Sequence, residues 1–241
     1  MNSEMGITLD GIRDINVYQN KNGYRFSVDA LLLYSFVNTR HAGKIIDLGA
    51  GSGIIGLLLA KKYVAAEVSL LELQESLWKL AEKNIELNGL QERVGVIRAD
   101  IKNIAELLEP GSYEIAVSNP PFRKQESGRL SAGEEKAVAR HEIRLRLSEL
   151  VDSASYLLKA KGRFFMIFHP ERILELIDTL RQKRLEPKRV RFVHNDADST
   201  SKIVLVEAVK EGRAGLKIER PLFLYDKQGA YTDEVEKMYG T

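Results

Sequence analysis

The sequence predicts a doubly wound α/β fold, in which helices cover both faces of a mostly parallel seven-stranded sheet with an antiparallel last strand. Short apolar segments with strand character alternate with helical segments along most of the 241 residues, a pattern typical of a parallel sheet. A glycine-rich turn joins the first core strand to the helix after it. Only the polar loop 195–201 separates the last two strands, so we expect them to pair as an antiparallel hairpin.

The first forty residues, 1–40, are expected to form an N-terminal cap segment ahead of the sheet. Short strands are predicted around Asp10-Gly11 within residues 7–19. Ser27 or Asp29 then caps an apolar helix from Ala30 to Val37, because short polar side chains accept hydrogen bonds from the first N–H groups of a helix. The core follows as residues 41–211, and residues 212–241 are expected to form a C-terminal extension packed on it.

The core alternates strands and helices from residue 44 onward. Asn88-Gly89 and Pro110-Gly111 end two of the helices, since these residue types favour turns. The predicted strands are Lys44–Leu48, Val68–Leu71, Val94–Arg98, Glu114–Val117, Phe164–Phe168, Val190–His194 and Ile203–Val209. The predicted helices are Ile54–Lys62, Glu75–Leu87, Ile104–Leu108, Leu147–Leu158 and Pro170–Lys183.

The composition is that of a globular protein with a sizeable core. Hydrophobic residues make up 44% of the chain and charged residues 29%, and the net charge is only +2. This balance alone does not indicate nucleic acid, which usually selects a strongly basic face. The absence of cysteine excludes disulfides, thiolate metal sites and a cysteine nucleophile. The four histidines lack metal-ligand spacing, so no metal is expected.

The N-terminus shows no basic stretch followed by an apolar one, so no signal peptide is expected. No apolar run approaches the length of a membrane span. We therefore expect a cytoplasmic protein without membrane contact, and a monomer is favoured.

The glycine-rich turn follows Asp47 and contains Gly51-x-Gly53-x-x-Gly56. Glycines let backbone N–H groups approach a ligand closely, and the positive end of the next helix faces the same place. Glu72 ends the second strand about twenty residues later, where dinucleotide-binding folds carry a ribose-binding carboxylate. This pattern alone suits NAD as well as S-adenosylmethionine.

Groups at successive strand ends favour S-adenosylmethionine over NAD. Asp47 is badly placed for a pyrophosphate but well placed for the amino acid portion of a zwitterionic ligand. Asp100 follows the third strand and suits an adenine amino group, and Asn119 follows the fourth. The carboxyl ends of parallel strands share one edge of a sheet, where such folds bind ligands. A cap or turn role remains the alternative for each acid taken alone.

The turn Asn119-Pro120-Pro121-Phe122 presents groups suited to a flat molecule with an exocyclic amine. The two prolines end the strand and stiffen the turn because neither has a backbone N–H. The Asn119 oxygen and a carbonyl of the proline segment can accept both amine hydrogens, and Phe122 can stack on the ring. A simple proline turn with a buried phenylalanine is the alternative interpretation.

These motifs together resemble Rossmann-like class I S-adenosylmethionine-dependent methyltransferases that modify an amino nitrogen. Gln19, the segment Gly23–Leu33 and the terminal Tyr225…Tyr231-Thr232 are similar to the bacterial valine-tRNA adenine N6-methyltransferases, and the similarity covers essentially the whole chain. The resemblance implies that residues 41–211 are a methyltransferase core. It also implies N6-methylation of the adenine just 3′ of the anticodon of valine tRNA.

The resemblance further implies a set of site residues. The implied catalytic residues are Asn119, Pro120 and Phe122. The implied cofactor-binding residues are Gln19, Arg25, Asp29, Asp47, Gly49, Gly51, Gly53, Glu72, Leu73, Asp100, Ile101 and Asn119. The implied reaction is a direct displacement that depends on positioning and electrostatic preorganisation.

Two basic stretches are candidate contacts for tRNA phosphates. Arg123 to Arg146 follows the Asn-Pro-Pro-Phe turn without strand character, which is consistent with a mobile substrate loop. Arg181 to Arg191 carries about six cations and one acid. A solvated helix end and edge strand is the alternative interpretation of the second stretch.

Other functions remain open from the residues alone. A protein-glutamine N5-methyltransferase uses the same kind of turn, usually with Tyr in place of Phe122, and ordinarily carries an extra N-terminal helical domain. An rRNA adenine-N6 methyltransferase is a second alternative. A noncatalytic RNA-binding module would not need the intact Asp47, Glu72 and Asn119, and cofactor binding would distinguish it. A NAD-dependent dehydrogenase is disfavoured by Asp47 and by the Asn-Pro-Pro-Phe turn.

Overall fold

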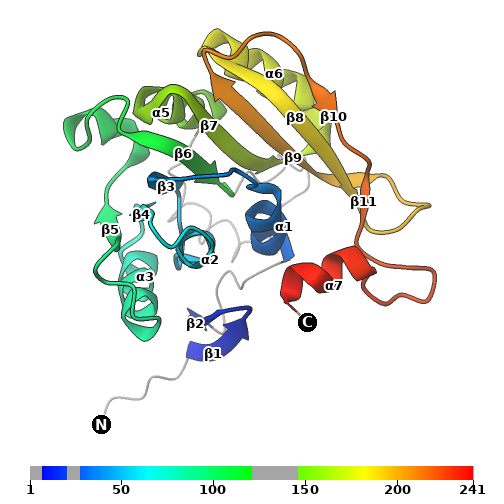
Figure 1. Ribbon diagram of the computed structural model, residues 1–241, viewed down its shortest axis with the longest axis horizontal. Coiled ribbons are helices and arrows are strands. Elements are labelled where there is room, and N and C mark those ends of the chain that lie inside the picture. The colour runs from blue at the N-terminus through cyan, green and yellow to red at the C-terminus, as the bar shows by residue number, and fades with distance from the viewer. Residues whose placement is uncertain (1–6, 21–27, 121–145, 241) are drawn as a thin grey trace, which may run out of the picture.

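The computed structural model describes residues 7–20, 28–120 and 146–240, and its centre is a twisted nine-stranded sheet (Figure 1). The strand order is β10-β8-β9-β7-β6-β3-β4-β5, with β11 also pairing along β8. Seven of the strands are those that the sequence predicts. Their bounds are Lys44–Leu48 (β3), Glu67–Glu72 (β4), Val94–Arg98 (β5), Tyr113–Ser118 (β6), Leu158–Phe168 (β7), Leu185–His194 (β8) and Ser201–Lys210 (β9).

The two additional strands come from the C-terminal extension. β10 (Lys217–Ile218) and β11 (Leu222–Phe223) both pair with β8 in parallel. The predicted count of seven strands was therefore two too low, because a two-residue strand is too short to show an alternating pattern.

The strand directions confirm a mostly parallel sheet with an antiparallel strand. β5, β4, β3, β6 and β7 run parallel to one another, whereas β9 is antiparallel to both β7 and β8. The predicted final hairpin is thus β8–β9. Parallel pairing places the carboxyl ends of β3, β4, β5 and β6 along one edge.

Helices cover both faces of the sheet (Figure 1). Successive residues of a strand point to opposite faces, and Ile45 and Ile46 of β3 accordingly belong to two different core clusters. The first cluster includes residues of α1 (Val28–Phe36), α2 (Ile54–Lys62), α3 (Glu75–Leu87) and α7 (Asp233–Tyr239). The second includes residues of the 3₁₀ helix η1 (Ile101–Glu106), α5 (Leu147–Leu157) and α6 (Ile173–Gln182).

The N-terminal segment forms a separate antiparallel hairpin of β1 (Ile7–Ile12) and β2 (Ile15–Asn20). The strands were predicted around Asp10-Gly11, but both residues lie inside β1. The turn falls instead at Arg13-Asp14, where Arg13 adopts φ 50°. Asp29 lies in the first turn of α1 and does not precede it, so the predicted helix start was two residues late. Ser27 lies outside the described residues.

Several other boundaries differ from those predicted. β7 begins at Leu158, six residues before its predicted start. Its first half was not predicted as a strand because it carries lysines at the exposed margin of the sheet and lacks an apolar run. The predicted helix Pro170–Lys183 divides into a 3₁₀ turn, η2 (Pro170–Arg172), and α6. The predicted helix Ile104–Leu108 is the 3₁₀ helix η1, which begins three residues earlier. Within the described ranges, no helix is both long enough and apolar enough to cross a membrane.

Candidate active site at the carboxyl edge of the sheet

The glycine-rich turn has two parts with different roles. Gly49 and Gly51 adopt positive φ values of 78° and 59°, and a Cβ atom on either would meet no atom of the described residues within 4 Å. A Cβ atom on Gly53 or Gly56 would instead lie 2.8 or 2.1 Å from methyl groups of Leu70. The first two glycines therefore border open space where a ligand can approach the backbone, whereas the last two allow α2 to pack on β4.

Asp47 ends β3 as a buried carboxylate with an unused acceptor. Its side chain is 1% exposed, and Oδ2 accepts a hydrogen bond from the Gly56 N–H at 3.1 Å. Oδ1 is buried without a hydrogen-bond partner in the described part of the chain. Burial raises the pKa of Asp47 to about 7; the Gly56 N–H opposes this and the charge of Glu72 adds to it. A buried acceptor of this kind suits a cationic or hydrogen-bond-donating ligand.

Glu72 ends β4 with both carboxylate oxygens held by the backbone. Oε2 accepts the Gly51 N–H and Oε1 accepts the Gln74 N–H, each at 2.8 Å. Each oxygen of an ionised carboxylate can accept a second hydrogen bond. The fold thus orients Glu72 while leaving it able to accept from two neighbouring hydroxyl groups, such as those of a ribose. Leu73, the next residue, is half-buried.

Asp100 and Ile101 follow β5 at the same edge. Asp100 caps the 3₁₀ helix by accepting the Lys102 N–H through Oδ1 at 3.0 Å. Ile101 is buried in the second core cluster, and its carbonyl accepts the hydroxyl of Ser153 at 3.0 Å. Both residues are thereby fixed next to the end of β5.

Asn119 and Pro120 are held beside the glycine-rich turn. β6 pairs with β3 so that Val117 lies opposite Asp47. The buried Ser118 hydroxyl then donates to the Leu48 carbonyl at 2.7 Å. This bond ties the two strand ends together immediately before Asn119. Asn119 and Pro120 are half-buried, whereas Phe122, the third implied catalytic residue, lies outside the described residues.

The structure describes two of the three N-terminal residues that the resemblance implies for cofactor binding. Gln19 lies on β2 and is nearly fully buried, and its amide nitrogen donates to Asp10 Oδ2 at 2.8 Å. Asp29 is half-buried in the first turn of α1. Arg25 falls in the range 21–27, which the structure does not describe.

Three residues that tie together the elements around the site were not predicted from the sequence. Ser118 ties β6 to β3, as described above. Asn84 on α3 and Asn88, the C-cap of the same helix, hydrogen bond to the backbone of β2, and Asn84 also reaches the glycine-rich turn at Ser52. Their spacing of four residues on an amphipathic helix was the available signal, because it places both amides on one face.

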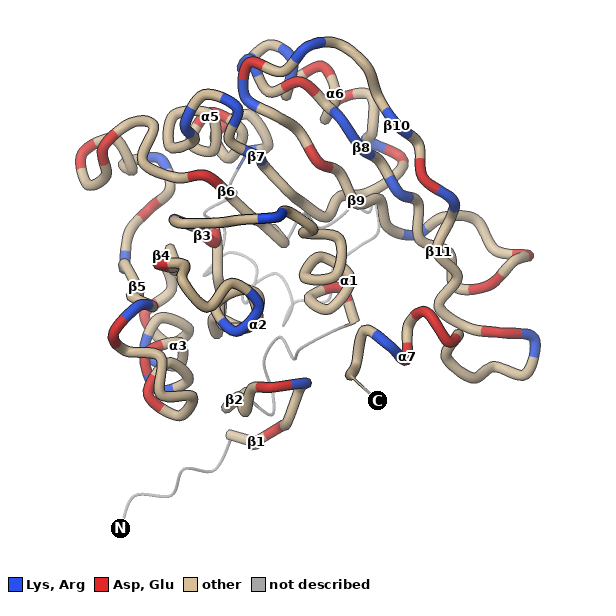
Figure 2. Tube along the Cα trace, in the orientation of Figure 1, with Lys and Arg blue, Asp and Glu red and all other residues tan. Residues whose placement is uncertain are grey.

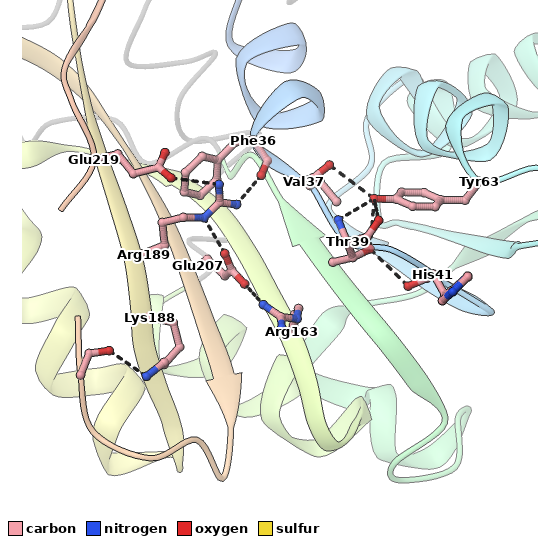
Figure 3. Close-up of polar contacts among 11 residues, drawn as sticks. Phe36, Val37, Thr39, His41, Tyr63, Arg163, Lys188, Arg189, Glu207 and Glu219 are labelled. Atoms are coloured by element: carbon pink, nitrogen blue, oxygen red, sulfur yellow. Dashed lines mark hydrogen bonds and ion pairs between the residues drawn. The ribbon is translucent and has the colours of Figure 1, made fainter. Parts of the chain in front are cut away.

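The cations of the stretch Arg181 to Arg191 are used within the protein. Figure 2 shows acidic residues interspersed with the cations of this region. Arg189 pairs with Glu207 and Glu219, donates to the Phe36 carbonyl and lies over the Phe36 ring (Figure 3). The other pairs are Arg181–Glu186, Lys183–Asp152, Arg184–Glu211 and Arg191–Glu234, and Lys188 donates to two backbone carbonyls. These contacts reduce the positive charge available to phosphates, so tRNA binding by this stretch stays a prediction.

The other predicted basic stretch, Arg123 to Arg146, falls almost entirely within 121–145, outside the described residues. No group of three or more His, Asp or Glu side chains that could hold a metal occurs among the residues that the structure describes.

The fold and this ligand-facing edge define a class I methyltransferase. Residues 25–185 match the family model of the methyltransferase small domain, and the chain belongs to this family. It is therefore a methyltransferase that uses S-adenosylmethionine. The orphaned Asp47 oxygen, the open space at Gly49 and Gly51 and the oriented Glu72 fit this cofactor.

The chain is similar to several curated proteins over most of its length. A protein of Dyadobacter fermentans is 22% identical over 92% of this chain and 90% of its own length. A protein of Flavobacterium johnsoniae is 26% identical over 92% and 93%, and one of Porphyromonas gingivalis is 29% identical over 71% and 69%. All three are named tRNA1(Val) (adenine(37)-N6)-methyltransferase.

Solved structures show the same fold. A predicted O-methyltransferase from Agrobacterium tumefaciens superimposes with a TM-score of 0.72 and 24% identity, over 88% of this chain and 95% of that one. A 16S rRNA N2 methyltransferase from T. thermophilus gives a TM-score of 0.62 and 20% identity, over 87% and 52%.

Proposed function

We propose that this enzyme transfers a methyl group from S-adenosylmethionine to N6 of adenine in tRNA, at the adenosine 3′ of the anticodon of valine tRNA. The observation that carries the proposal is the Asn119-Pro120 turn, fixed beside the glycine-rich turn by the Ser118–Leu48 hydrogen bond. The names of the curated relatives, which match up to 92% of this chain, support the choice of tRNA.

The proposed cofactor contacts use the carboxyl ends of three strands. Glu72 accepts from the ribose hydroxyls, because both of its oxygens are already oriented by backbone N–H groups. Asp47 faces the cationic amino acid portion, and Asp100 accepts from the adenine amino group. Gly49 and Gly51 leave room for the ligand next to the backbone. Bound in this way, S-adenosylmethionine supplies an electrophilic methyl group on its sulfonium.

The proposed catalytic step is a direct displacement. An adenine amino group is a poor nucleophile because its lone pair is shared with the ring. Asn119 Oδ1 and the Pro120 carbonyl accept the two amine hydrogens and favour a pyramidal nitrogen aimed at the methyl group. The nitrogen forms the new bond to carbon as the bond to sulfur breaks, and one amine proton leaves to water afterwards. No general base is needed before transfer.

The substrate base must first leave its stack or already lie in an open loop. Phe122 is proposed to stack on the exposed base, which would contribute roughly 1–3 kcal/mol. The stretch Arg123 to Arg146 is proposed to contact tRNA phosphates. Charge reversals there are then expected to flatten the salt dependence of tRNA binding, and an unchanged slope would count against this contact.

Transfer of labelled methyl from S-adenosylmethionine to unmodified total tRNA, followed by nucleoside analysis, tests the proposal. We expect the label in N6-methyladenosine. If label entered only ribosomal RNA or protein glutamine when these are offered in place of tRNA, the proposed substrate would change and the proposed methyl-transfer chemistry would stay. No transfer to any of these, together with intact cofactor binding, would refute adenine N6 of tRNA as the acceptor and place the acceptor outside these three substrate classes.

A further inference from the structure

The outer edge of β2 is bound by side chains of a helix in place of another strand. Asn84 Oδ1 accepts the Tyr18 N–H at 2.7 Å, and its Nδ2 donates to the Tyr18 carbonyl at 3.2 Å. Asn88 does the same one turn later, accepting the Asn16 N–H at 3.0 Å and donating to the Asn16 carbonyl at 2.7 Å. Each asparagine amide therefore completes both hydrogen bonds of one strand residue.

The distance between the two asparagines is close to the distance between the two residues of β2 that they bind. Asn84 lies on α3 and Asn88 is the C-cap of this helix, four residues later, which corresponds to a rise of about 6 Å. Asn16 and Tyr18 are two residues apart on β2, which corresponds to roughly 6.8 Å, and their backbone groups point to the same edge. The two amides thus align with alternate residues of the strand and hold the β1–β2 hairpin on the core.

Of the two asparagines, Asn84 alone is hydrogen bonded to the glycine-rich turn in the described part of the chain. Its Nδ2 also donates to the Ser52 carbonyl at 2.9 Å, and its side chain is fully buried. Ser52 lies between Gly51, whose N–H holds Glu72, and Gly53. Asn88 instead makes its remaining bond to the Asn84 carbonyl within the helix.

We propose that Asn84 is a positioning residue for the cofactor. By holding the Ser52 carbonyl, it fixes the glycine-rich turn in the shape that presents Gly51 to Glu72. Because the same amide also holds Tyr18, the attachment of the hairpin and the shape of the turn depend on one side chain. S-adenosylmethionine binding and hairpin attachment are then coupled, and linkage requires the coupling to act in both directions.

The matched variants Asn84→Ala and Asn88→Ala test this role, since each removes both bonds to one residue of β2 but only the first removes the bond to Ser52. In calorimetric titrations with S-adenosylmethionine, we expect Asn84→Ala to weaken binding about tenfold or more, the effect of one or more lost hydrogen bonds. Asn88→Ala is expected to stay within about threefold of the wild type. In turnover, Asn84→Ala should raise KM for the cofactor with kcat nearly unchanged.

Amide hydrogen exchange of the wild-type protein gives a second readout that needs no variant. S-adenosylmethionine is expected to slow exchange of the Tyr18 N–H about tenfold and to affect the Asn16 N–H less. The coupling should persist in Asn88→Ala and disappear in Asn84→Ala. Wild-type affinity in Asn84→Ala, equal losses of affinity in both variants, or Tyr18 exchange that is unchanged by the cofactor would each overturn the proposal. The calorimetric and hydrogen-exchange measurements need no tRNA, so they are independent of the proposed RNA substrate.

Discussion

At the scale of single residues, Asn119 carries the proposed chemistry. Its amide oxygen is the proposed acceptor for the amine, whereas the proposed cofactor contacts are assigned to Asp47, Glu72 and Asp100. We expect Asn119→Ala to lower the rate of transfer on the order of 10²–10³-fold, the effect of removing one preorganised group from an active site. Single-turnover methyl transfer measures this loss. Calorimetry should show S-adenosylmethionine affinity close to that of the wild type, and unchanged turnover would refute the role of Asn119.

Asp47 makes the stability of the cofactor-free protein depend on pH. Burial raises its pKa to about 7, above the value near 4 of an unfolded chain. The folded protein therefore binds a proton more tightly than the unfolded chain, and this contribution to stability is fully present below about pH 4. It is lost as the pH rises through about 7.

Asp47→Asn is expected to remove this part of the pH dependence. Urea unfolding of the cofactor-free protein should show the wild type losing stability relative to the variant between pH 5 and pH 8. Because a cationic ligand favours the ionised carboxylate, wild-type affinity for S-adenosylmethionine should rise over the same range and the affinity of the variant should not. Parallel pH profiles for the two proteins would contradict this account.

The sequence predicted correctly that three acidic residues lie at or just after the ends of neighbouring strands, and their roles in cofactor binding stay predictions. Asp47, Glu72 and Asp100 each follow an apolar run that becomes a strand of the sheet. Asn84 and Asn88 were missed because polar residues on a helix normally face water, and only the tertiary structure brings β2 against them.

At the scale of elements, the contact between α2 and β4 depends on Gly56. A Cβ atom there would lie 2.1 Å from Leu70 Cδ2, and Leu70 is fully buried. We expect Gly56→Ala to lower the free energy of unfolding by about 1–3 kcal/mol through overpacking, although alanine favours helix formation.

The double variant Gly56→Ala/Leu70→Ala separates this clash from other effects. Leu70→Ala alone should cost about 2–5 kcal/mol, and the double variant should cost less than the sum of the two single variants because the new methyl fills part of the cavity. Urea unfolding of all four proteins measures the coupling. If the losses of unfolding free energy in the two single variants add up to that of the double variant, the methyl group of Gly56→Ala does not clash with Leu70.

The sequence predicted correctly the elements that have clear local signals, and it missed those that depend on pairing with another strand. α2, α3 and β5 have the predicted bounds. β10 and β11 exist only because β8 offers an edge to pair with. The first half of β7 is extended despite its lysines as the continuation of the segment from Arg163 onward, which pairs with both β6 and β9. Neither cause can be seen in a local stretch of sequence.

At the scale of the whole molecule, Glu207 links segments that are distant in the chain. This buried carboxylate on β9 pairs with Arg163 on β7 and Arg189 on β8 (Figure 3). Arg189 also contacts Phe36 at the end of α1 and Glu219 in the C-terminal extension. The N-terminal segment, the sheet and the extension therefore meet at one ion-pair network.

We expect Glu207→Ala to lower the free energy of unfolding by about 3–5 kcal/mol, since it leaves a largely buried guanidinium without its main partner. The exposed pair Lys44–Glu67 provides the control, and Glu67→Ala should cost about 0–1 kcal/mol. Chemical denaturation measures both. Similar small losses in the two variants would show that the network adds little to stability.

The proposed function is tested most directly with two forms of valine tRNA, unmodified and identical except for guanosine in place of the adenosine 3′ of the anticodon. Labelled methyl transfer from S-adenosylmethionine is measured for each. The account predicts that label enters only the first tRNA, appears as N6-methyladenosine and is lost with Asn119→Ala. Equal label in both tRNAs, or label that survives in Asn119→Ala, would contradict it.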